Sequence, residues 1–69
     1  MEKIVIQVEG MTCDHCVQAI TKAVSALPGI GSVAVDLAGG TATVEHDPGT
    51  TDAAKIKAEI EDLGYDVVE

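Results

Sequence analysis

Two cysteines, Cys13 and Cys16, lie three positions apart near the start of the chain and are the only ones in its 69 residues. They fall where an alternating, strand-like pattern gives way to a helical one. The unpaired amides and the macrodipole at a helix N-terminus favour anions, so the pKa values of these thiols should be lowered. Two thiolates on one side of an ion favour soft Cu(I) and leave room for a third sulfur from outside. The spacing therefore predicts an open metal site suited to transfer rather than storage.

Three other kinds of site use the same spacing. A structural zinc site needs four ligands, and the chain offers the two cysteines, His15 and the distant His46. In thiol-disulfide exchange, Cys13 would be the nucleophile and Cys16 the resolving thiol. No Trp precedes the pair, however, and no later proline starts a strand that could flank it. A buried structural pair fits poorly because Cys13 lies among polar residues.

Strands are predicted where apolar and polar residues alternate. The alternation covers residues 3–9, 33–37 and 42–47, and a short final strand covers residues 65–68. Gly39 and Gly40 lie between the two middle strands, where the glycine pair is expected to supply the positive backbone dihedrals of a tight turn. The middle strands are therefore predicted to form a hairpin.

Helices are predicted where apolar residues recur at helical spacing. The first begins at Asp14 or His15 and runs to Leu27. The second is predicted to begin at a cap formed by Thr50 or Thr51. The expected buried stripes are Val17, Ile20, Val24 and Leu27 in the first helix, and Ala53, Ile56, Ile60 and Leu63 in the second.

The order of these segments, strand, helix, strand, strand, helix, strand, predicts the fold class. It is that of an α+β, ferredoxin-like βαββαβ open-faced sandwich, in which two helices cover one face of a four-stranded antiparallel sheet. The chain is too short for two domains with a cleft between them, and it contains no linker or internal repeat. A single domain over residues 1–69 is therefore expected.

Charge and hydropathy exclude other classes of function. Lys and Arg total 4 against 12 Asp and Glu, giving a formal net charge of −8 that repels nucleic acid and anionic lipid. No apolar run reaches the length of a membrane helix, and the N-terminus lacks the pattern of a signal peptide. We expect a cytoplasmic protein that binds no nucleic acid and does not insert into membranes. In that compartment the two cysteines stay reduced.

A longer motif surrounds the cysteines. Residues 10–16 read G-M-T-C-D-H-C, and the helix that follows leads to Pro28-Gly29, the Gly-Gly hairpin and L-G-Y-D-V at residues 63–67. Over essentially the whole chain this pattern resembles the heavy-metal-associated domain family, and in particular its small bacterial copper chaperones. The resemblance implies Cu(I) bound by Cys13 and Cys16. It also implies transfer by ligand exchange to the metal-binding domain of a copper P-type ATPase or to a copper-sensing repressor, without enzymatic turnover.

Further residues acquire expected roles beside the metal loop. By the same resemblance, Met11 points under the loop into the core and positions it without binding copper, and Tyr65 lies beside the loop. The Tyr65 hydroxyl would shield or hydrogen-bond a sulfur, or its ring would simply fill the end of the core. His15 is expected to face solvent as a weak ligand, a bridge between protomers or a bystander. His46 is expected to be a satisfied histidine near a strand end rather than a ligand.

The sequence is compatible with more than one metal ion and more than one oligomeric state. The N-terminal domain of mercuric reductase shares much of the motif, two thiolates also suit Hg(II), and Zn(II) or Cd(II) would bind in vitro. A metal-binding domain excised from a copper ATPase is another reading of the chain. The apo protein is expected to be a monomer, and copper shared by four thiolates would bridge a homodimer. Lys22 is a candidate salt-bridge residue toward an acidic partner, with weak, salt-sensitive docking.

Overall fold

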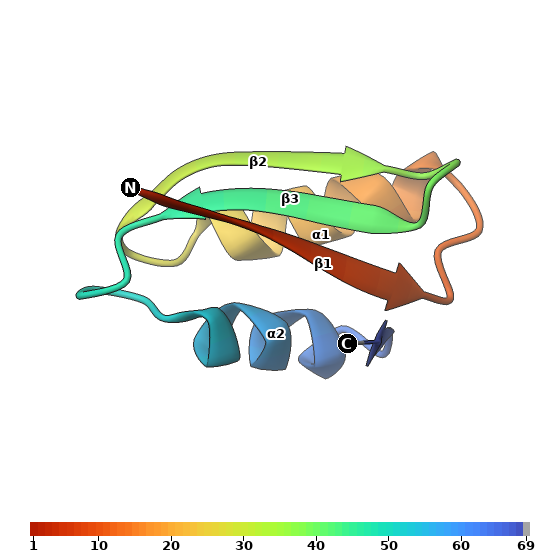
Figure 1. Cartoon of the computed structure of the whole chain (residues 1–69). Coiled ribbons are helices and arrows are strands. Elements are labelled where there is room, and N and C mark those ends of the chain that lie inside the picture. Colours follow the sequence, from red (N-terminus) through yellow and green to blue (C-terminus); the bar gives the residue numbers. More distant parts are fainter. Residues whose placement is uncertain (69) are drawn as a thin grey trace.

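Six elements of regular structure follow one another in the predicted order. The computed structural model describes residues 1–68, and Glu69, the last residue of the predicted domain, lies outside the described residues. The elements are β1 (Glu2–Glu9), α1 (Asp14–Ser25), β2 (Ile30–Asp36), β3 (Thr41–His46), α2 (Ala53–Asp62) and β4 (Asp66–Val68). The strands form one antiparallel sheet in the order β2-β3-β1-β4, and both helices lie on one of its faces (Figure 1). The predicted open-faced βαββαβ sandwich is confirmed.

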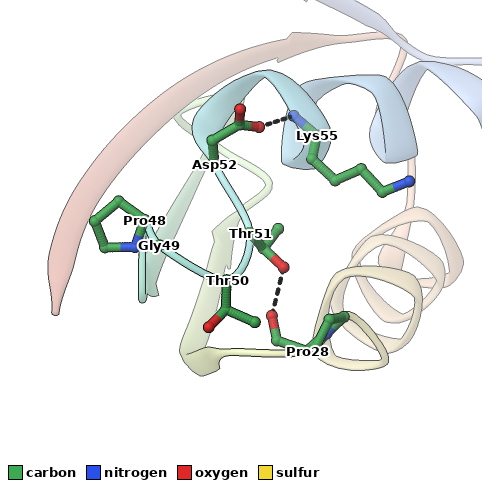
Figure 2. A pocket seen from close by; sticks show the side chains of 7 residues that line it. All are labelled: Pro28, Pro48, Gly49, Thr50, Thr51, Asp52 and Lys55. Carbon is green, nitrogen blue, oxygen red and sulfur yellow. Dashed lines mark hydrogen bonds between the residues drawn. The ribbon is translucent and has the colours of Figure 1, made fainter.

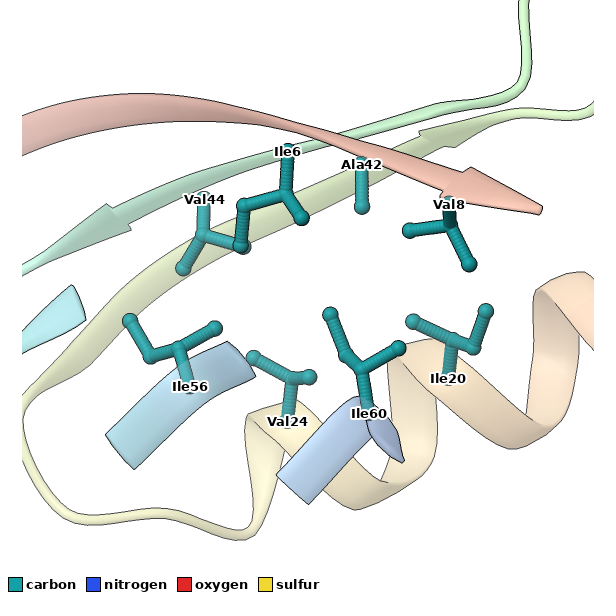
Figure 3. Packing of buried hydrophobic residues seen from close by; sticks show 8 residues of the cluster. All are labelled: Ile6, Val8, Ile20, Val24, Ala42, Val44, Ile56 and Ile60. Carbon is teal, nitrogen blue, oxygen red and sulfur yellow. The ribbon is translucent and has the colours of Figure 1, made fainter. Parts of the chain in front are cut away.

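The hydrophobic core lies between the sheet and the two helices. Alternate side chains of β1 and β3 point down onto side chains that rise at helical spacing from α1 and α2 (Figure 3). None of the buried hydrophobic side chains is aromatic, so small aliphatic groups hold the domain together, each contributing about 1.5–3 kcal/mol when it is a fully buried Val or Ile. The buried set is Ile6, Val8, Ile20, Val24, Ala42, Val44, Ile56 and Ile60.

The predicted stripe of α2 is wrong at its last position. Leu63 is 40% exposed and is the C-cap residue of α2, whereas Ile56 and Ile60 are completely buried. The helix ends one residue earlier, and Gly64 then takes a positive φ of 99° that turns the chain toward β4. Helical spacing in the sequence places Leu63 on the buried stripe. The helix ends at Asp62, however, so the Leu63 side chain does not point toward the sheet.

The first helix and the first hairpin strand also differ from their predicted limits. α1 ends at Ser25 rather than Leu27, because the Leu27 amide bonds to the Val24 carbonyl at 3.0 Å in a tightened last turn. β2 begins three residues earlier than predicted, at Ile30, with a register shift between Ile30 and Ser32. This irregularity interrupts the alternation from which the strand was predicted.

The hairpin turn uses one glycine for its backbone conformation, not two. Gly40 has a φ of 66°, whereas Gly39 is not among the residues with positive φ. Gly39 instead donates its amide to the Asp36 carboxylate at 3.1 Å. The expectation that both glycines supply positive dihedrals is therefore wrong. Gly40 alone has a positive φ, and a hydrogen bond to the Asp36 side chain holds Gly39 in the turn.

Asp52, and not Thr50 or Thr51, caps α2. The Asp52 carboxylate accepts the amide of Lys55 at 2.9 Å (Figure 2). The hydroxyl of Thr51 donates instead to the carbonyl of Pro28, and that of Thr50 donates to a carboxylate in the preceding turn. The predicted cap is wrong because both threonine hydroxyls are engaged in tertiary and turn contacts.

Removing this cap should cost measurable stability. Asp52→Ala leaves the amide of Lys55 without its partner, so we expect the free energy of unfolding to fall by about 1 kcal/mol. Asp52→Asn retains a side-chain oxygen that can accept the same amide and should lose only a few tenths. Urea unfolding of the two variants and the wild type measures the difference. Equal stability of Asp52→Ala and the wild type would show that the cap contributes nothing.

Candidate metal centre

The cysteine loop leaves the sheet at the C-terminal end of β1. Gly10 turns the chain with a φ of 97°, a conformation that costs glycine least. Cys13 is the N-cap of α1, and its carbonyl accepts the amide of Cys16 at 3.0 Å. The Cys13 side chain makes no capping hydrogen bond. The local fold thus presents both thiols at the start of a helix, as the sequence predicts.

Both thiols are free, and they differ in exposure. Cys13 is exposed and Cys16 is half-buried. Within residues 1–68 there is no group of three or more His, Cys, Asp or Glu side chains able to hold a metal ion. An ion at this loop would therefore have two soft protein donors and an open side toward solvent, which suits Cu(I) and an incoming external thiolate.

Tyr65 links the C-terminal segment to the cysteine loop. Its ring packs against the core, and its Cδ1 lies 3.6 Å from the position that a Cβ on Gly10 would occupy. A side-chain hydrogen bond from Tyr65 is the largest cause that lowers the pKa of Cys16, to about 6, followed by a backbone hydrogen bond from Thr12. The same contact raises the pKa of Tyr65. A pKa of about 6 favours the thiolate form of Cys16 at neutral pH, and Tyr65 both packs against the core and hydrogen-bonds the sulfur.

Tyr65→Phe should reverse this shift while keeping the ring. Without the hydroxyl, we expect the pKa of Cys16 to rise from about 6 toward its ordinary value. The thiolate absorbance of the reduced protein against pH measures it, in a Cys13→Ser background so that one thiol titrates. Because the folded-state pKa is depressed, its contribution to stability is present above the unfolded pKa and is lost as pH falls through about 6. Unchanged titration in Tyr65→Phe would exclude Tyr65 as the cause.

The other residues singled out from the sequence are divided between the two ends of the molecule. Met11 is half-buried and packs against the core beneath the loop, and His15 is exposed in the first turn of α1. The backbone contribution of Thr12 to the Cys16 thiolate was missed by sequence reasoning, because an amide leaves no signal in a side-chain pattern. Met11 thus packs inward and His15 faces solvent, and a role of either residue beside a bound metal stays a prediction.

His46 lies at the far end of the sheet, away from the cysteines. It pairs with Glu2 at the start of β1, whereas the cysteine loop follows the end of that strand. The side chain is 1% exposed, and its Nδ1 is 2.7 Å from the carbonyl of Thr51, which can only accept, so Nδ1 donates. Nε2 is buried without a partner among the described residues. His46 is thus half satisfied and is no part of the cysteine site.

A pocket in the structure is also remote from the cysteines. A pocket of about 310 Å³ lies between the C-terminal side of α1 and the start of α2, with Pro28 and Lys55 among its lining residues (Figure 2). Neither cysteine contributes to it. In the described part of the chain, moreover, neither helix has the length and apolar character needed to cross a membrane.

Comparison with known proteins identifies what this arrangement resembles. The sequence profile of the heavy-metal-associated domain matches residues 5–66. The copper chaperone CopZ of Bacillus subtilis (strain 168) is 43% identical over 67 residues, which are 97% of each chain. Copper-transporting ATPase 1 of Rattus norvegicus is 42% identical over 97% of this chain, which spans 4% of that protein's length. A solved structure of a CopZ metallochaperone superimposes with a TM-score of 0.94 at 37% identity, covering 97% of this chain and 100% of that one.

Proposed function

The chain belongs to the heavy-metal-associated domain family, and on that premise we propose that it is a Cu(I) carrier that delivers copper to another protein by ligand exchange. The observation that supports this most directly is the two-thiol loop, in which Cys13 is exposed, Cys16 is half-buried and the pKa of Cys16 is lowered to about 6. A site with two donors and an open side holds an ion without enclosing it. Such a site binds and releases metal by exchanging Cu–S bonds, and no enzymatic turnover is proposed.

The ligands in this proposal are the thiolates of Cys13 and Cys16. When a recipient thiolate binds the copper, a third Cu–S bond forms, and one bond to this chain then breaks. A second recipient thiolate replaces the remaining bond in the same way, so two Cu–S bonds form and two break. Copper stays Cu(I) throughout, so no electron donor is needed. Each recipient thiol that becomes a ligand releases a proton to solvent, and each thiolate freed from copper takes one up according to its pKa. The hydrogen bond from Tyr65 keeps Cys16 ready to bind again without first losing a proton.

The recipient in this proposal is a domain with a similar dithiol site. The copper chaperone CopZ of Bacillus subtilis and a copper-transporting ATPase both contain stretches 42–43% identical to this chain. Transfer between two sites of the same kind involves little difference in affinity, and it is therefore reversible. We propose the metal-binding domain of a copper P-type ATPase as the recipient, or a copper-sensing repressor, in the cytoplasm where thiols stay reduced.

An anaerobic competition titration tests the function. Reduced protein is titrated with Cu(I) against a chromophoric chelator, with parallel titrations of Hg(II) and Zn(II). We expect one tight Cu(I) equivalent per chain, and Cu(I) passing rapidly to the soluble domains of a copper ATPase. Weak Cu(I) binding by a fully reduced chain would contradict the proposal, and a much stronger preference for Hg(II) would favour mercury handling instead.

A further inference from the structure

His46 is a buried titratable side chain that the proposed function does not use. It is the last residue of β3, where the sheet register pairs it with Glu2 of β1 and Ile30 of β2. It points to the helix side of the sheet, in phase with the core residues Ala42 and Val44, and 1% of its surface is exposed. Buried polar atoms generally have hydrogen-bond partners, so the surroundings of both ring nitrogens decide how this side chain behaves.

One ring nitrogen of His46 belongs to a set of hydrogen bonds that joins the loop after α1, the end of β3 and the loop before α2. Nδ1 donates to the carbonyl of Thr51 at 2.7 Å, and the hydroxyl of Thr51 donates to the carbonyl of Pro28 (Figure 2). The amide of Asp47 donates to the carbonyl of Gly29 at 2.8 Å, and the amide of Thr51 donates to the carbonyl of Asp47 at 2.9 Å. We call these five residues the clasp.

The clasp is closely packed and shielded from solvent. A Cβ built on Gly29 would lie 2.8 Å from the Cβ of Thr50, which is closer than side chains pack, and Gly29 has a φ of 76°. Thr51 is 3% exposed, so its bond with His46 is formed between two buried residues. A charge placed there loses its hydration and must be compensated by a partner within the protein.

The other ring nitrogen of His46, Nε2, is buried without a hydrogen-bond partner among residues 1–68. With Nδ1 donating, Nε2 of the neutral ring carries a lone pair and can only accept. A proton at Nε2 would turn this lone pair into a second N–H and would place a positive charge where no acceptor is present. Burying an unpaired charge costs far more than burying an unpaired lone pair. The geometry therefore favours the neutral ring over the imidazolium ion.

Three carboxylates lie near the clasp, and none of them bonds to Nε2. Glu2 is the ladder partner of His46 and so shares its face of the sheet, but the Glu2 side chain is exposed. The carboxylate of Asp47 accepts hydrogen bonds within its own turn, and that of Asp52 accepts the amide of Lys55. Pairing of Glu2 with a protonated ring is therefore the alternative that an experiment must distinguish.

The positive groups near the clasp oppose a further positive charge. Lys55 and Lys57 are in the first half of α2, whose N-terminus carries the positive end of the helix dipole. Lys22 is in the last turn of α1, and the α-ammonium group belongs to Met1 at the start of β1. Residues 26–35, which contain the loop after α1 and most of β2, include no charged side chain. Nothing on these segments offers an acceptor for an imidazolium ion.

We propose that the clasp is acid-sensitive: a proton taken up from solvent by Nε2 of His46 opens it and frees the ends of both helices at the side of the domain remote from the cysteines. This inference does not depend on copper binding. A solvated histidine takes up a proton near pH 6.5, about where the folded clasp resists it. The open state therefore binds more protons, so stability is unaffected above about pH 6.5 and falls as the pH drops below it.

Urea unfolding between pH 7 and pH 5 tests the proposal. All proteins carry Cys13→Ser and Cys16→Ser, so that no thiol titrates. The test variant adds His46→Asn, whose side-chain amide can donate to Thr51 as Nδ1 does but takes up no proton in this range. The control variant adds His15→Asn, which removes the exposed histidine instead. Asparagine is smaller than histidine and lowers stability at every pH, so the change with pH is compared.

The cysteine-free protein and the control variant should give the same result. From pH 7 to pH 5, we expect their unfolding equilibrium constants to rise at least about tenfold more than that of the test variant. An equal pH dependence in all three proteins would overturn the proposal.

Nuclear magnetic resonance of the histidine rings in the wild type gives a second measurement that needs no substitution at His46. In folded molecules the ring of His46 should keep the signals of a neutral, Nδ1-protonated imidazole down to pH 5, while those of the exposed His15 change as it takes up a proton. A folded His46 that takes up a proton over the same pH range as His15, alone or paired with Glu2, would show that the clasp tolerates the charge and would refute its acid sensitivity.

Discussion

Replacing Cys13 and Cys16 together with serine should abolish tight Cu(I) binding. Hydroxyl groups are hard donors that stay protonated at neutral pH, so the soft ion loses both of its ligands. Among residues 1–68 no cluster of three or more potential ligands is available as a substitute. We expect a loss of affinity of at least about a thousandfold, or about 4 kcal/mol, in anaerobic competition with a chelator.

His15→Ala is the control for this experiment. His15 is adjacent to the loop and exposed, and its replacement leaves both thiols in place. We expect its Cu(I) affinity to stay close to that of the wild type. Copper should also raise the thermal stability of the wild type and of His15→Ala, because a ligand that binds the folded state stabilises that state. It should not raise the thermal stability of the double serine variant, which cannot bind copper tightly. One tight equivalent retained by the double variant would refute the assignment of the ligands.

Ile60→Ala should have the largest effect on the fold. Ile60 is completely buried between the helices and the sheet (Figure 3), so its truncation removes apolar contacts and leaves a cavity. We expect the free energy of unfolding to fall by about 2–5 kcal/mol. The single core of so small a domain rarely supplies more than about 3–5 kcal/mol. The apo variant should therefore be largely unfolded, as measured by circular dichroism and urea titration.

Leu63→Ala tests whether burial or helical spacing in the sequence decides how much stability a truncation costs. Helical spacing places Leu63 on the same stripe as Ile60, yet its side chain is 40% exposed. Its truncation should cost less than about 1 kcal/mol, in line with other changes to exposed side chains. Comparable losses in Leu63→Ala and Ile60→Ala would mean that both are core residues and that the end of α2 differs from the structure described.

Much of the fold follows from local patterns. The alternation in β1 identifies Ile6 and Val8 as inward-facing, and helical spacing identifies Ile20, Val24 and Ile56 as buried, as the structure confirms. These predictions succeed because the period of an element decides which side chains share a face. They fail at the ends of elements, where hydrogen bonds with other segments decide the outcome. Asp52 caps α2 because the hydroxyls of neighbouring threonines are already engaged.

The candidate site divides in the same way. Sequence alone determined the two thiols, their spacing and their place between a strand and a helix, because these depend on residues 10–16 and on a local change of period. Only the tertiary structure decided that Tyr65 lowers the pKa of Cys16 and that Glu9 faces Asp66 beside the loop. Local spacing carries no information about which distant segments meet. That is set by strand register and helix packing, which bring the C-terminal segment with Tyr65 and Asp66 against the loop that follows β1.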